Sequence, residues 1–284
     1  MDILTSVLEM KEWSRTNRAQ GRTIGFVPTM GYLHEGHLSL IRRCRAENDA
    51  VVVSIFVNPT QFGPGEDLDR YPRDLEADSR KCTDLGTDLL FVPNSTEMYG
   101  SNYHTFVEVE RLSGVLCGAS RPGHFRGVAT VVLKLFNIVS PAAAYFGTKD
   151  YQQLQVIRTM ARDFDLDVRI VPCETVREPD GLAMSSRNVY LAPAERKQAV
   201  CLYQALRTAE RLFHNGENRA DEYLRIMRER ISLEPDARPD YISLVNPETL
   251  EDLREVGDRA LAVLAVRVGK TRLIDNMLFE NEKN

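Results

Sequence analysis

Runs of apolar residues without polar alternation recur along the first 175 residues of the chain. These runs cover residues 23–28, 50–59, 87–93, 142–147 and 167–172. Continuous Val, Ile and Phe residues indicate strands that are buried on both faces, as in a parallel sheet. Segments with helical spacing alternate with these runs, at residues 36–48, 74–86, 127–139 and 150–164. The alternation predicts a Rossmann-like doubly wound parallel α/β domain over residues 1–175, with ligands at the carboxyl ends of its strands.

The pattern changes after residue 176. The expected helices and strands of this part cover residues 192–217, 220–233, 240–245 and 259–268. The first of these helices has Pro193 in its first turn and Asn215-Gly216 near its end, as is typical of helix ends. A smaller C-terminal α+β domain is therefore predicted over residues 176–284.

Composition and charge narrow the class of protein. The chain has 284 residues, and 43% of them are hydrophobic, which suffices for one large core or two smaller ones. No apolar stretch approaches the ~18 residues of a membrane-spanning helix, and the N-terminus does not resemble a secretory signal. The five cysteines form no C-x-x-C pair, which favours reduced thiols. With a net charge of −5, we expect a cytoplasmic protein without a nucleic-acid or membrane partner.

Three segments imitate well-known motifs, but each lacks an essential residue. VRVGKT, residues 266–271, ends like a P-loop, yet Leu264 stands where that motif begins with glycine. GPGEDL, residues 63–68, has Leu68 in place of the last glycine of a dinucleotide fingerprint. In HEGHL the fifth residue is leucine, so the zinc-binding H-E-x-x-H pattern is not met. None of these three motifs is therefore present in the chain.

His34 and His37 form an H-x-G-H pattern between a predicted strand and a predicted helix. At the start of a helix, free backbone N–H groups and the helix dipole favour an anion. Gly36 lets the backbone approach a phosphate closely, and two imidazoles one turn apart can face one ligand. A metal site would need a third ligand, and the other histidines show no ligand spacing. Anion binding is favoured, and a purely structural role in capping or packing stays open.

FGTKDYQQ, residues 146–153, is a second place where a strand end turns into a helix. Lys149 near a helix N-terminus would direct a cation at bound phosphates. Asp150 suits the helix N-cap, which is also its structural alternative. Gln153 lies one turn further on, where it could face the same cavity. We therefore favour a functional role for this segment.

GLAMSSRN, residues 181–188, is a polar segment near the predicted domain boundary. Ser185, Ser186 and Arg187 supply hydroxyl and guanidinium donors there. Such a loop could close over a polyphosphate during reaction, and the alternative is that it is simply solvated.

Two further segments carry polar side chains of interest. In SIFVNPTQFG, residues 54–63, Asn58 and Gln61 follow a buried strand, where they suit recognition of a hydroxyl or a carboxylate. GASRPGHFRGV, residues 118–128, is rich in glycine and arginine. This second segment either faces an anion or forms a surface turn.

Taken together, H-x-G-H near the N-terminus and the later M-S-S-R resemble the nucleotidyltransferase superfamily that includes class I aminoacyl-tRNA synthetases. Within it, the chain is similar to the pantothenate synthetase (pantoate–β-alanine ligase) family in six segments: FVPTMGYLHEGH, SIFVNPTQF, RPGHFRGVATVV, FGTKDYQQL, DGLAMSSRN and TRLIDN. The resemblance covers nearly the whole chain and is strongest up to about residue 190 and near 270–276. Ala183 departs from the wider superfamily, whose K-M-S-K-S loop opens with lysine, so Lys149 is the better candidate for a phosphate-binding lysine.

The resemblance implies a reaction without a protein nucleophile. The carboxylate of pantoate attacks the α-phosphorus of ATP, and pantoyl adenylate and pyrophosphate result. The amine of β-alanine then attacks the acyl carbon, giving pantothenate and AMP. Catalysis of this kind rests on positioning and charge stabilisation.

The resemblance also implies roles for individual residues. His37 would donate a proton, with His34 beside it on the phosphates, and Gln61 and Gln153 would hold pantoate, Gln61 also lying near β-alanine. Charge on the triphosphate would be neutralised by Lys149, Ser185, Ser186 and Arg187. Asn58 is a further substrate-binding candidate. The nucleotide site would comprise Met30, Gly31, Tyr32, Leu33, His34, Glu35, Gly36, His37, Gly147, Thr148, Lys149, Asp150, Val176, Met184, Ser185, Ser186 and Arg187.

The remaining expectations concern cofactors, assembly and alternatives. ATP would bring Mg²⁺, whose ligands stay unknown, with Asp78 as one acidic candidate. The resemblance implies a homodimer, and the domain over residues 176–284 is expected to act as a lid that carries the M-S-S-R loop. Another adenylyltransferase of the superfamily is one alternative function. A non-catalytic nucleotide-binding regulator is another, which the complete set of motifs disfavours.

Overall fold

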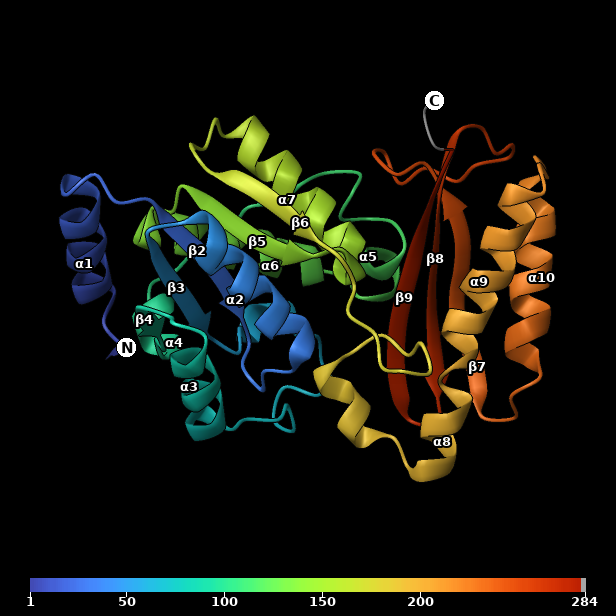
Figure 1. Cartoon of the computed structure of the whole chain (residues 1–284), viewed down its shortest axis with the longest axis horizontal. Helices are drawn as coiled ribbons and strands as arrows, with labels where there is room; N and C mark the ends of the chain where they lie inside the picture. Colours follow the sequence, from blue (N-terminus) through green and yellow to red (C-terminus); the bar gives the residue numbers. More distant parts are fainter. Residues whose placement is uncertain (282–284) are drawn as a thin grey trace. The chain divides into compact units, whose positions relative to one another are not determined.

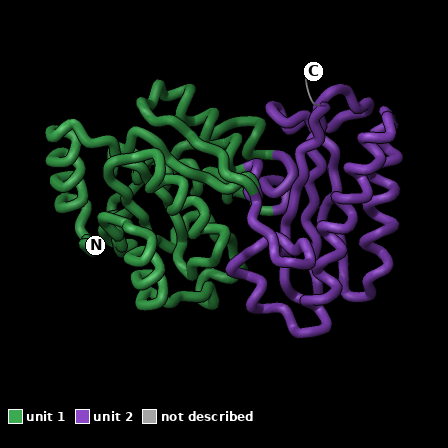
Figure 2. Tube along the Cα trace, viewed as in Figure 1, with its two compact units in different colours: residues 1–114, 121–148, 153–174 green, residues 115–120, 149–152, 175–284 purple. Residues whose placement is uncertain are grey.

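The computed structural model describes residues 1–281, which pack into two compact units (Figure 2). Unit 1 consists of residues 1–114, 121–148 and 153–174. Unit 2 consists of the described residues from 175 onwards together with two short earlier segments, 115–120 and 149–152. Lys149 and Asp150 therefore pack with the C-terminal part of the chain, although Gly147 and Thr148 directly before them belong to unit 1.

Unit 1 contains a six-stranded sheet in which every paired strand is parallel to its neighbour (Figure 1). The order across the sheet is β1-β4-β3-β2-β5-β6. The strands are β1 (Asp2–Leu4), β2 (Ile24–Thr29), β3 (Ala50–Ile55), β4 (Leu89–Phe91), β5 (Ala143–Gly147) and β6 (Arg169–Cys173). The predicted doubly wound parallel sheet is confirmed.

Helices cover both faces of this sheet, which explains why its strands are apolar throughout. Phe26 of β2 makes an edge-on contact with Phe136 of α6, with 6.5 Å between ring centroids. The next residue, Val27, points the other way and packs in one core cluster with Leu40 and Ile41 of α2. The helical elements that lie wholly in unit 1 are α1 (Val7–Ala19), α2 (Glu35–Glu47), η1 (Pro59–Gln61), α3 (Leu75–Asp84), α4 (Ser95–Met98) and α6 (His124–Val139). Two further elements, η2 (Thr148–Asp150) and α7 (Tyr151–Asp163), are divided between the units, because residues 149–152 belong to unit 2.

Unit 2 is built on a three-stranded antiparallel sheet with the order β7-β8-β9. Its elements are α5 (Cys117–Ser120), η3 (Ser186–Tyr190), α8 (Pro193–Gln198), α9 (Cys201–His214), α10 (Ala220–Ser232), β7 (Ala237–Val245), β8 (Arg259–Val268) and β9 (Thr271–Glu280). Helices α9 and α10 lie side by side along this sheet (Figure 1). Leu206, Tyr223 and Phe279 are among the residues of the shared core. The predicted smaller α+β part is thus also confirmed.

Several elements differ from the sequence prediction. The helix expected over 192–217 is two helices, α8 and α9, separated by a turn at residues 199–200. Strand β9 was not predicted, because Asp275 and Asn276 interrupt its apolar pattern. The pattern also gave no sign of β1 and α1.

Two further features concern the length of the helices and the state of the cysteines. No helix within residues 1–281 combines the length and apolar character needed to cross a membrane. All five cysteines are buried and free of disulfide bonds.

Candidate active site

The candidate residues of unit 1 follow three neighbouring parallel strands. His34 follows β2, Gln61 follows β3, and Thr148 follows β5, and β2 lies between β3 and β5. From β2 the chain adds β3 and β4 on one side and β5 and β6 on the other, so the order of strands changes direction at β2. Open α/β sheets bind ligands at the carboxyl ends of strands beside such a switch point. The predicted residues are therefore brought to the expected edge of the sheet.

A tight turn links β2 to α2 and places the first histidine. Gly31 and Tyr32 both have left-handed backbone angles, with φ of 83° and 52°. A Cβ atom at Gly31 would be 2.9 Å from the side chain of Ile55, so glycine is required both for the backbone angle and for the space. The backbone of the turn therefore packs closely against Ile55, the last residue of β3.

Asp78 of α3 fixes this turn. Its two carboxylate oxygens accept hydrogen bonds from the N–H groups of Tyr32 and Leu33, each at 2.7 Å. Burial raises the pKa of Asp78, although these two N–H groups and Lys81 oppose the shift. The ammonium of Lys81, one turn further along α3, donates to the carbonyl of Leu33 at 2.6 Å. Asp78 is therefore an anchor for the turn, which argues against the role of Mg²⁺ ligand considered from the sequence.

His34 and His37 lie against each other at the start of α2. Their ring centroids are 4.1 Å apart. His34 is the N-cap, and its Nδ1 accepts from the N–H of Gly36 at 3.2 Å, while Nδ1 of His37 accepts from the N–H of His34 at 3.3 Å. An Nδ1 that accepts places the proton of a neutral ring on Nε2. In both rings, capping through Nδ1 is thus compatible with a proton on Nε2.

Asn58 and Gln61 form a buried amide pair after β3. Asn58 is only 1% exposed. Its Nδ2 donates to Oε1 of Gln61 at 3.1 Å and to the carbonyl of Gly127 at 3.2 Å, and its Oδ1 accepts from the hydroxyl of Tyr99 at 2.8 Å. Gln61 donates its Nε2 to the sulfur of Met30 at 3.2 Å. Asn58 is therefore placed to orient Gln61.

A charged cluster holds the backbone of Gln61. Its carbonyl oxygen lies 2.8 Å from Nδ1 of His124 and 3.4 Å from Nη2 of Arg121. Arg121 also makes two bonds to Glu66, at 2.7 and 2.6 Å. Burial opposes ionisation of Glu66, but the hydrogen bonds and charge of Arg121 lower its pKa overall. The glycine- and arginine-rich segment thus packs around Gln61.

In unit 2, Lys149 lies in a short helical segment held by side chains. The carbonyl oxygen of Lys149 accepts from Nδ2 of Asn276 at 2.7 Å. Gln152 accepts from the N–H of Cys117 at 3.0 Å and donates to the carbonyl of Val115 at 2.7 Å. The ammonium of Lys149 lies 3.9 Å from a carboxylate oxygen of Asp150. The backbone of Lys149 is therefore held by Asn276, while its ammonium group lies beside the carboxylate of Asp150.

The M-S-S-R segment of unit 2 is also ordered by local bonds. The N–H of Met184 donates to the carbonyl of Val176 at 3.0 Å, so these two predicted nucleotide residues are neighbours. Ser185 is the N-cap of η3, and its Oγ accepts from the N–H of Arg187 at 3.3 Å. Ser186 is buried. The donors predicted for phosphate thus lie together at the start of one helical turn.

Each unit gathers its own share of the predicted residues. Unit 1 holds Met30, Gly31, Tyr32, Leu33, His34, Glu35, Gly36, His37, Asn58, Gln61, Gly147, Thr148 and Gln153. Unit 2 holds Lys149, Asp150, Val176, Met184, Ser185, Ser186 and Arg187.

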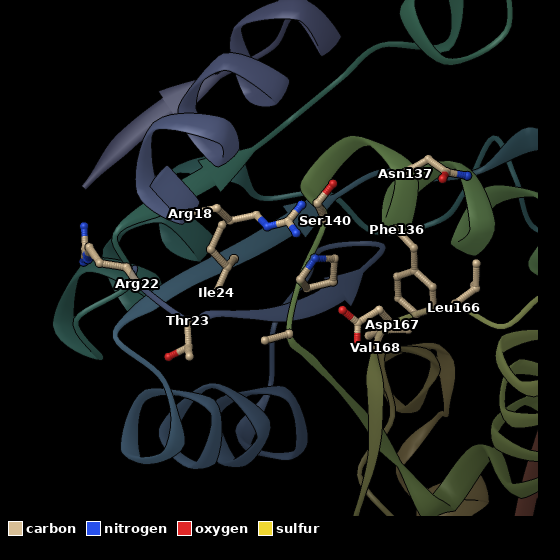
Figure 3. A pocket seen from close by; sticks show the side chains of 12 residues that line it. Arg18, Arg22, Thr23, Ile24, Phe136, Asn137, Ser140, Leu166, Asp167 and Val168 are labelled. Carbon is tan, nitrogen blue, oxygen red and sulfur yellow. The ribbon is translucent and has the colours of Figure 1, made fainter. Parts of the chain in front are cut away.

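A hollow of about 330 Å³ lies at the opposite edge of the parallel sheet of unit 1 (Figure 3). Its walls include Ile24, Ala142 and Val168, at or next to the amino ends of β2, β5 and β6. Arg18 and Asp167 also line it. None of the predicted site residues is among its lining residues, so the hollow and the candidate site are separate features.

Comparison with known proteins decides the family. The family model for pantoate-beta-alanine ligase matches residues 2–278. The chain belongs to the pantoate–β-alanine ligase family. It is 56% identical to a pantothenate synthetase from Thermotoga neapolitana, over 98% of this chain and 99% of the relative. It is 57% identical to one from Heliobacterium modesticaldum, over 99% of this chain and 100% of the relative.

Solved structures of the pantoate–β-alanine ligase family share the whole fold. The pantothenate synthetase of Thermus thermophilus superposes with a TM-score of 0.93 at 49% identity, covering 98% of this chain and 99% of that one. A pantoate–β-alanine ligase of Francisella tularensis, in complex with beta-gamma ATP and β-alanine, gives a TM-score of 0.82 at 36% identity. That match covers 98% of this chain and 97% of the other.

Some residues that hold the predicted site residues of this ligase in place were not predicted from the sequence. Lys81, Glu66 and Asn276 received no role, and His124 was seen only within a glycine- and arginine-rich segment. All of them contact the backbone of a predicted residue or hold a residue that does. Their contacts span dozens of residues along the chain, so no local spacing pattern signals them.

Proposed function

We propose that the protein catalyses the ATP-dependent condensation of pantoate with β-alanine to give pantothenate, AMP and pyrophosphate. The match of the family model to residues 2–278 carries this proposal. The histidine pair at the switch point of the parallel sheet supports it, because the start of α2 offers backbone N–H groups and a favourable dipole to an anion.

The reaction has two steps. In the first, a carboxylate oxygen of pantoate attacks the α-phosphorus of ATP, the bond to the β-phosphate oxygen breaks, and pyrophosphate leaves. In the second, the amine of β-alanine attacks the acyl carbon of pantoyl adenylate, the acyl–oxygen bond breaks, and AMP leaves with the electron pair. The amine loses a proton in this second step. Both steps gain from fixed positioning and from cations near the phosphates.

In unit 1, the proposed roles rest on the family resemblance, and the contacts of the histidines and of Asn58 support them. Each imidazole uses Nδ1 within the helix cap, so Nε2 of His37 is the group that donates to a phosphate oxygen as charge develops, and His34 assists beside it. Gln61 and Gln153 bind pantoate. Asn58 supports that binding by holding the amide of Gln61.

In unit 2, Lys149, Ser185, Ser186 and Arg187 are proposed to bind the phosphates of ATP. A lysine ammonium and a guanidinium neutralise charge on the leaving pyrophosphate. The nucleotide site also includes the backbone at Val176 and Met184, which are joined by a hydrogen bond.

Mg²⁺ is proposed to arrive with ATP. Among residues 1–281 no group of three histidine, cysteine or acidic side chains is arranged to hold a metal ion. The oxygens of Asp78 are both engaged by backbone N–H groups. Oxygen atoms of the triphosphate and water would therefore supply most of the coordination, as Mg²⁺ commonly requires. We also propose a homodimer in the cytoplasm, with residues 176–284 acting as a lid.

The proposal is tested by following pyrophosphate exchange. Purified protein is incubated with ATP, Mg²⁺ and radiolabelled pyrophosphate, with and without pantoate. We expect label to enter ATP only when pantoate is present, because only adenylation of pantoate is reversible by pyrophosphate. Addition of β-alanine should then release AMP in amounts equal to the pantothenate formed.

Three outcomes would contradict the proposal. Release of ADP in place of AMP would indicate a phosphorylated intermediate. Exchange that is independent of pantoate, together with pyrophosphate release that needs no amine, would indicate another adenylyltransferase. Binding of ATP without exchange or turnover would indicate a nucleotide-binding regulator.

A further inference from the structure

Strand β9 carries two adjacent buried polar residues that the proposed reaction does not use. Asp275 and Asn276 lie in the middle of this strand, opposite Leu264 and Val263 of β8. Asp275 is 3% exposed and Asn276 is 8% exposed. Buried polar side chains are costly unless they are hydrogen-bonded. The partners of this pair therefore show what the strand holds in place.

Asp275 faces the core of unit 2 and binds Arg177 there. Leu273, two residues before it, points to the same side of the strand and belongs to the core cluster. The carboxylate accepts two bonds from the guanidinium of Arg177, at 2.6 and 2.9 Å. Burial raises the pKa of Asp275, and the hydrogen bonds and charge of Arg177 oppose this shift. The pair is thus a bidentate buried ion pair, whose geometry is rigid.

Arg177 in turn fixes the turn that precedes the M-S-S-R segment. Its Nη1 donates to the carbonyl of Gly181 at 3.1 Å. The backbone of Arg177 also pairs with that of Ala183 in an antiparallel bridge. Gly181 has a φ of 95°, and a Cβ atom there would collide with the ring of Tyr203. The ion pair between Arg177 and Asp275 therefore fixes the backbone conformation of the residues that lead to Met184.

Asn276 points to the opposite side of β9, since successive residues of a strand alternate. Its Nδ2 donates to the carbonyl of Lys149 at 2.7 Å. The backbone carbonyl of Asn276 accepts a hydrogen bond from Nη2 of Arg177 at 3.4 Å. One dipeptide of β9 therefore contacts both the Lys149 segment and the arginine that orders the M-S-S-R turn, and all of these residues belong to unit 2.

We infer that Asp275 and Asn276 are positioning residues for adenylation, which set the spacing between the Lys149 ammonium and the donors of Ser185 to Arg187. This inference rests on the proposed function, since it assumes that both groups bind the triphosphate. Neither residue touches substrate. Asn276 acts through the backbone of Lys149, and Asp275 acts through Arg177. A displacement of about 1 Å at a reacting centre can reduce the rate by roughly 10²-fold.

Measuring the two half-reactions separately distinguishes misplaced triphosphate-binding groups from a general loss of structure. Pyrophosphate exchange with pantoate requires the triphosphate, whereas the reaction of isolated pantoyl adenylate with β-alanine does not. The variant Asn276→Ala removes the donor to Lys149. The matched control is Asn246→Ala in the same unit, because Asn246 also bonds backbone groups, the N–H groups of Glu248 and Thr249. Thermal midpoints of all variants are measured beside both half-reactions.

We expect Asn276→Ala to slow exchange tenfold or more, up to roughly 10²-fold, while its single-turnover rate with pantoyl adenylate stays within about twofold of wild type. The control should keep both rates. Exchange at the wild-type rate in Asn276→Ala would overturn the inference, and so would an equal loss in both half-reactions. If Asn276→Ala does not fold, Arg177→Lys decides in the same way, because it keeps the charge and loses the bidentate fork.

The same experiment distinguishes failure of the inference from failure of the proposed function. Wild-type protein that shows no pantoate-dependent exchange would overturn both. Wild-type exchange together with an unaffected variant would overturn only the positioning role.

Discussion

Gly127 of α6 lies directly against the backbone of η1 where Gln61 begins: a Cβ atom at position 127 would collide with the carbonyl oxygen of Thr60 and lie 2.7 Å from the backbone nitrogen of Gln61. The carbonyl of Gly127 also accepts from Nδ2 of Asn58. Overpacking of this kind costs about 1–3 kcal/mol. Gly127→Ala should therefore displace Gln61, and if about 1.4 kcal/mol of the strain falls on substrate binding, KM for pantoate rises about tenfold.

Steady-state kinetics with pantoate as the varied substrate check this expectation. KM for ATP should change much less than KM for pantoate, because the substitution lies beside Gln61. Gly257→Ala is the matched control, since a Cβ atom there meets nothing within 4 Å. An unchanged KM for pantoate in Gly127→Ala would show that Gln61 does not bind that substrate, or that α6 yields without moving it.

Low pH should lower the folding stability of the protein in part because Glu47 becomes protonated. This carboxylate accepts hydrogen bonds from Arg43, Arg169 and Tyr145, and these bonds lower its pKa from 4.5 to about 2. Because the pKa is lower in the folded state, the stabilisation is complete above about pH 4.5 and is lost as the pH falls towards 2. Glu47→Gln should therefore have a lower melting temperature than wild type at pH 7, and the difference should shrink at pH 3.

Melting curves of both proteins between pH 7 and pH 3 measure this effect, with Glu9→Gln as a control at an exposed position of α1. A difference in melting temperature that is the same at every pH would show that charge on Glu47 contributes nothing.

His37 has two functions that substitutions can separate. Its Nδ1 accepts from the N–H of His34 within the helix cap, while its Nε2 is the proposed proton donor. His37→Asn keeps an acceptor near Nδ1 and loses the donor, whereas His37→Gln places an amide nitrogen near Nε2. We expect His37→Asn to lose turnover by roughly 10²–10⁴-fold with its fold retained, and His37→Gln to lose less.

Circular dichroism and turnover of both variants test this assignment, with the exposed His214→Ala as control. If His37→Asn turns over as fast as wild type, His37 is not a proton donor and its part is confined to capping.

The buried strands of unit 1 could be predicted because helices cover both faces and every position favours an apolar residue. The same reasoning missed β9, where Asp275 stands on the core-facing side of the strand. That carboxylate is tolerated only because Arg177 reaches it from 98 residues away. Composition along the strand could not reveal a partner so distant in sequence.

The candidate site shows the same division between local and distant information. Local spacing identified His34 and His37, since a helix start brings residues three apart to one face. The residue that fixes the preceding turn, Asp78, lies 46 positions from Tyr32. Its role depends on α3 packing beside α2, which is a tertiary contact. From the sequence, Asp78 was only one acidic candidate for a Mg²⁺ ligand.

Asp78→Ala should disable the site by releasing the turn that leads into α2. The substitution leaves the N–H groups of Tyr32 and Leu33 without their acceptor. Each unsatisfied buried group costs about 1–3 kcal/mol, so the melting temperature should fall. Because Lys81 still holds the carbonyl of Leu33, we expect a folded protein whose pantoate-dependent exchange is reduced at least tenfold.

The controls separate an anchor from a metal ligand. Glu76→Ala on the same helix removes only an exposed pair with Arg80, which contributes little, so it should behave as wild type. Asp78→Asn retains one acceptor oxygen but turns an amide donor towards the second N–H group, so it should be destabilised as well. Raising Mg²⁺ should not restore either Asp78 variant, because the defect lies in the backbone. Rescue of exchange by Mg²⁺ at unchanged melting temperature would instead make Asp78 a metal ligand.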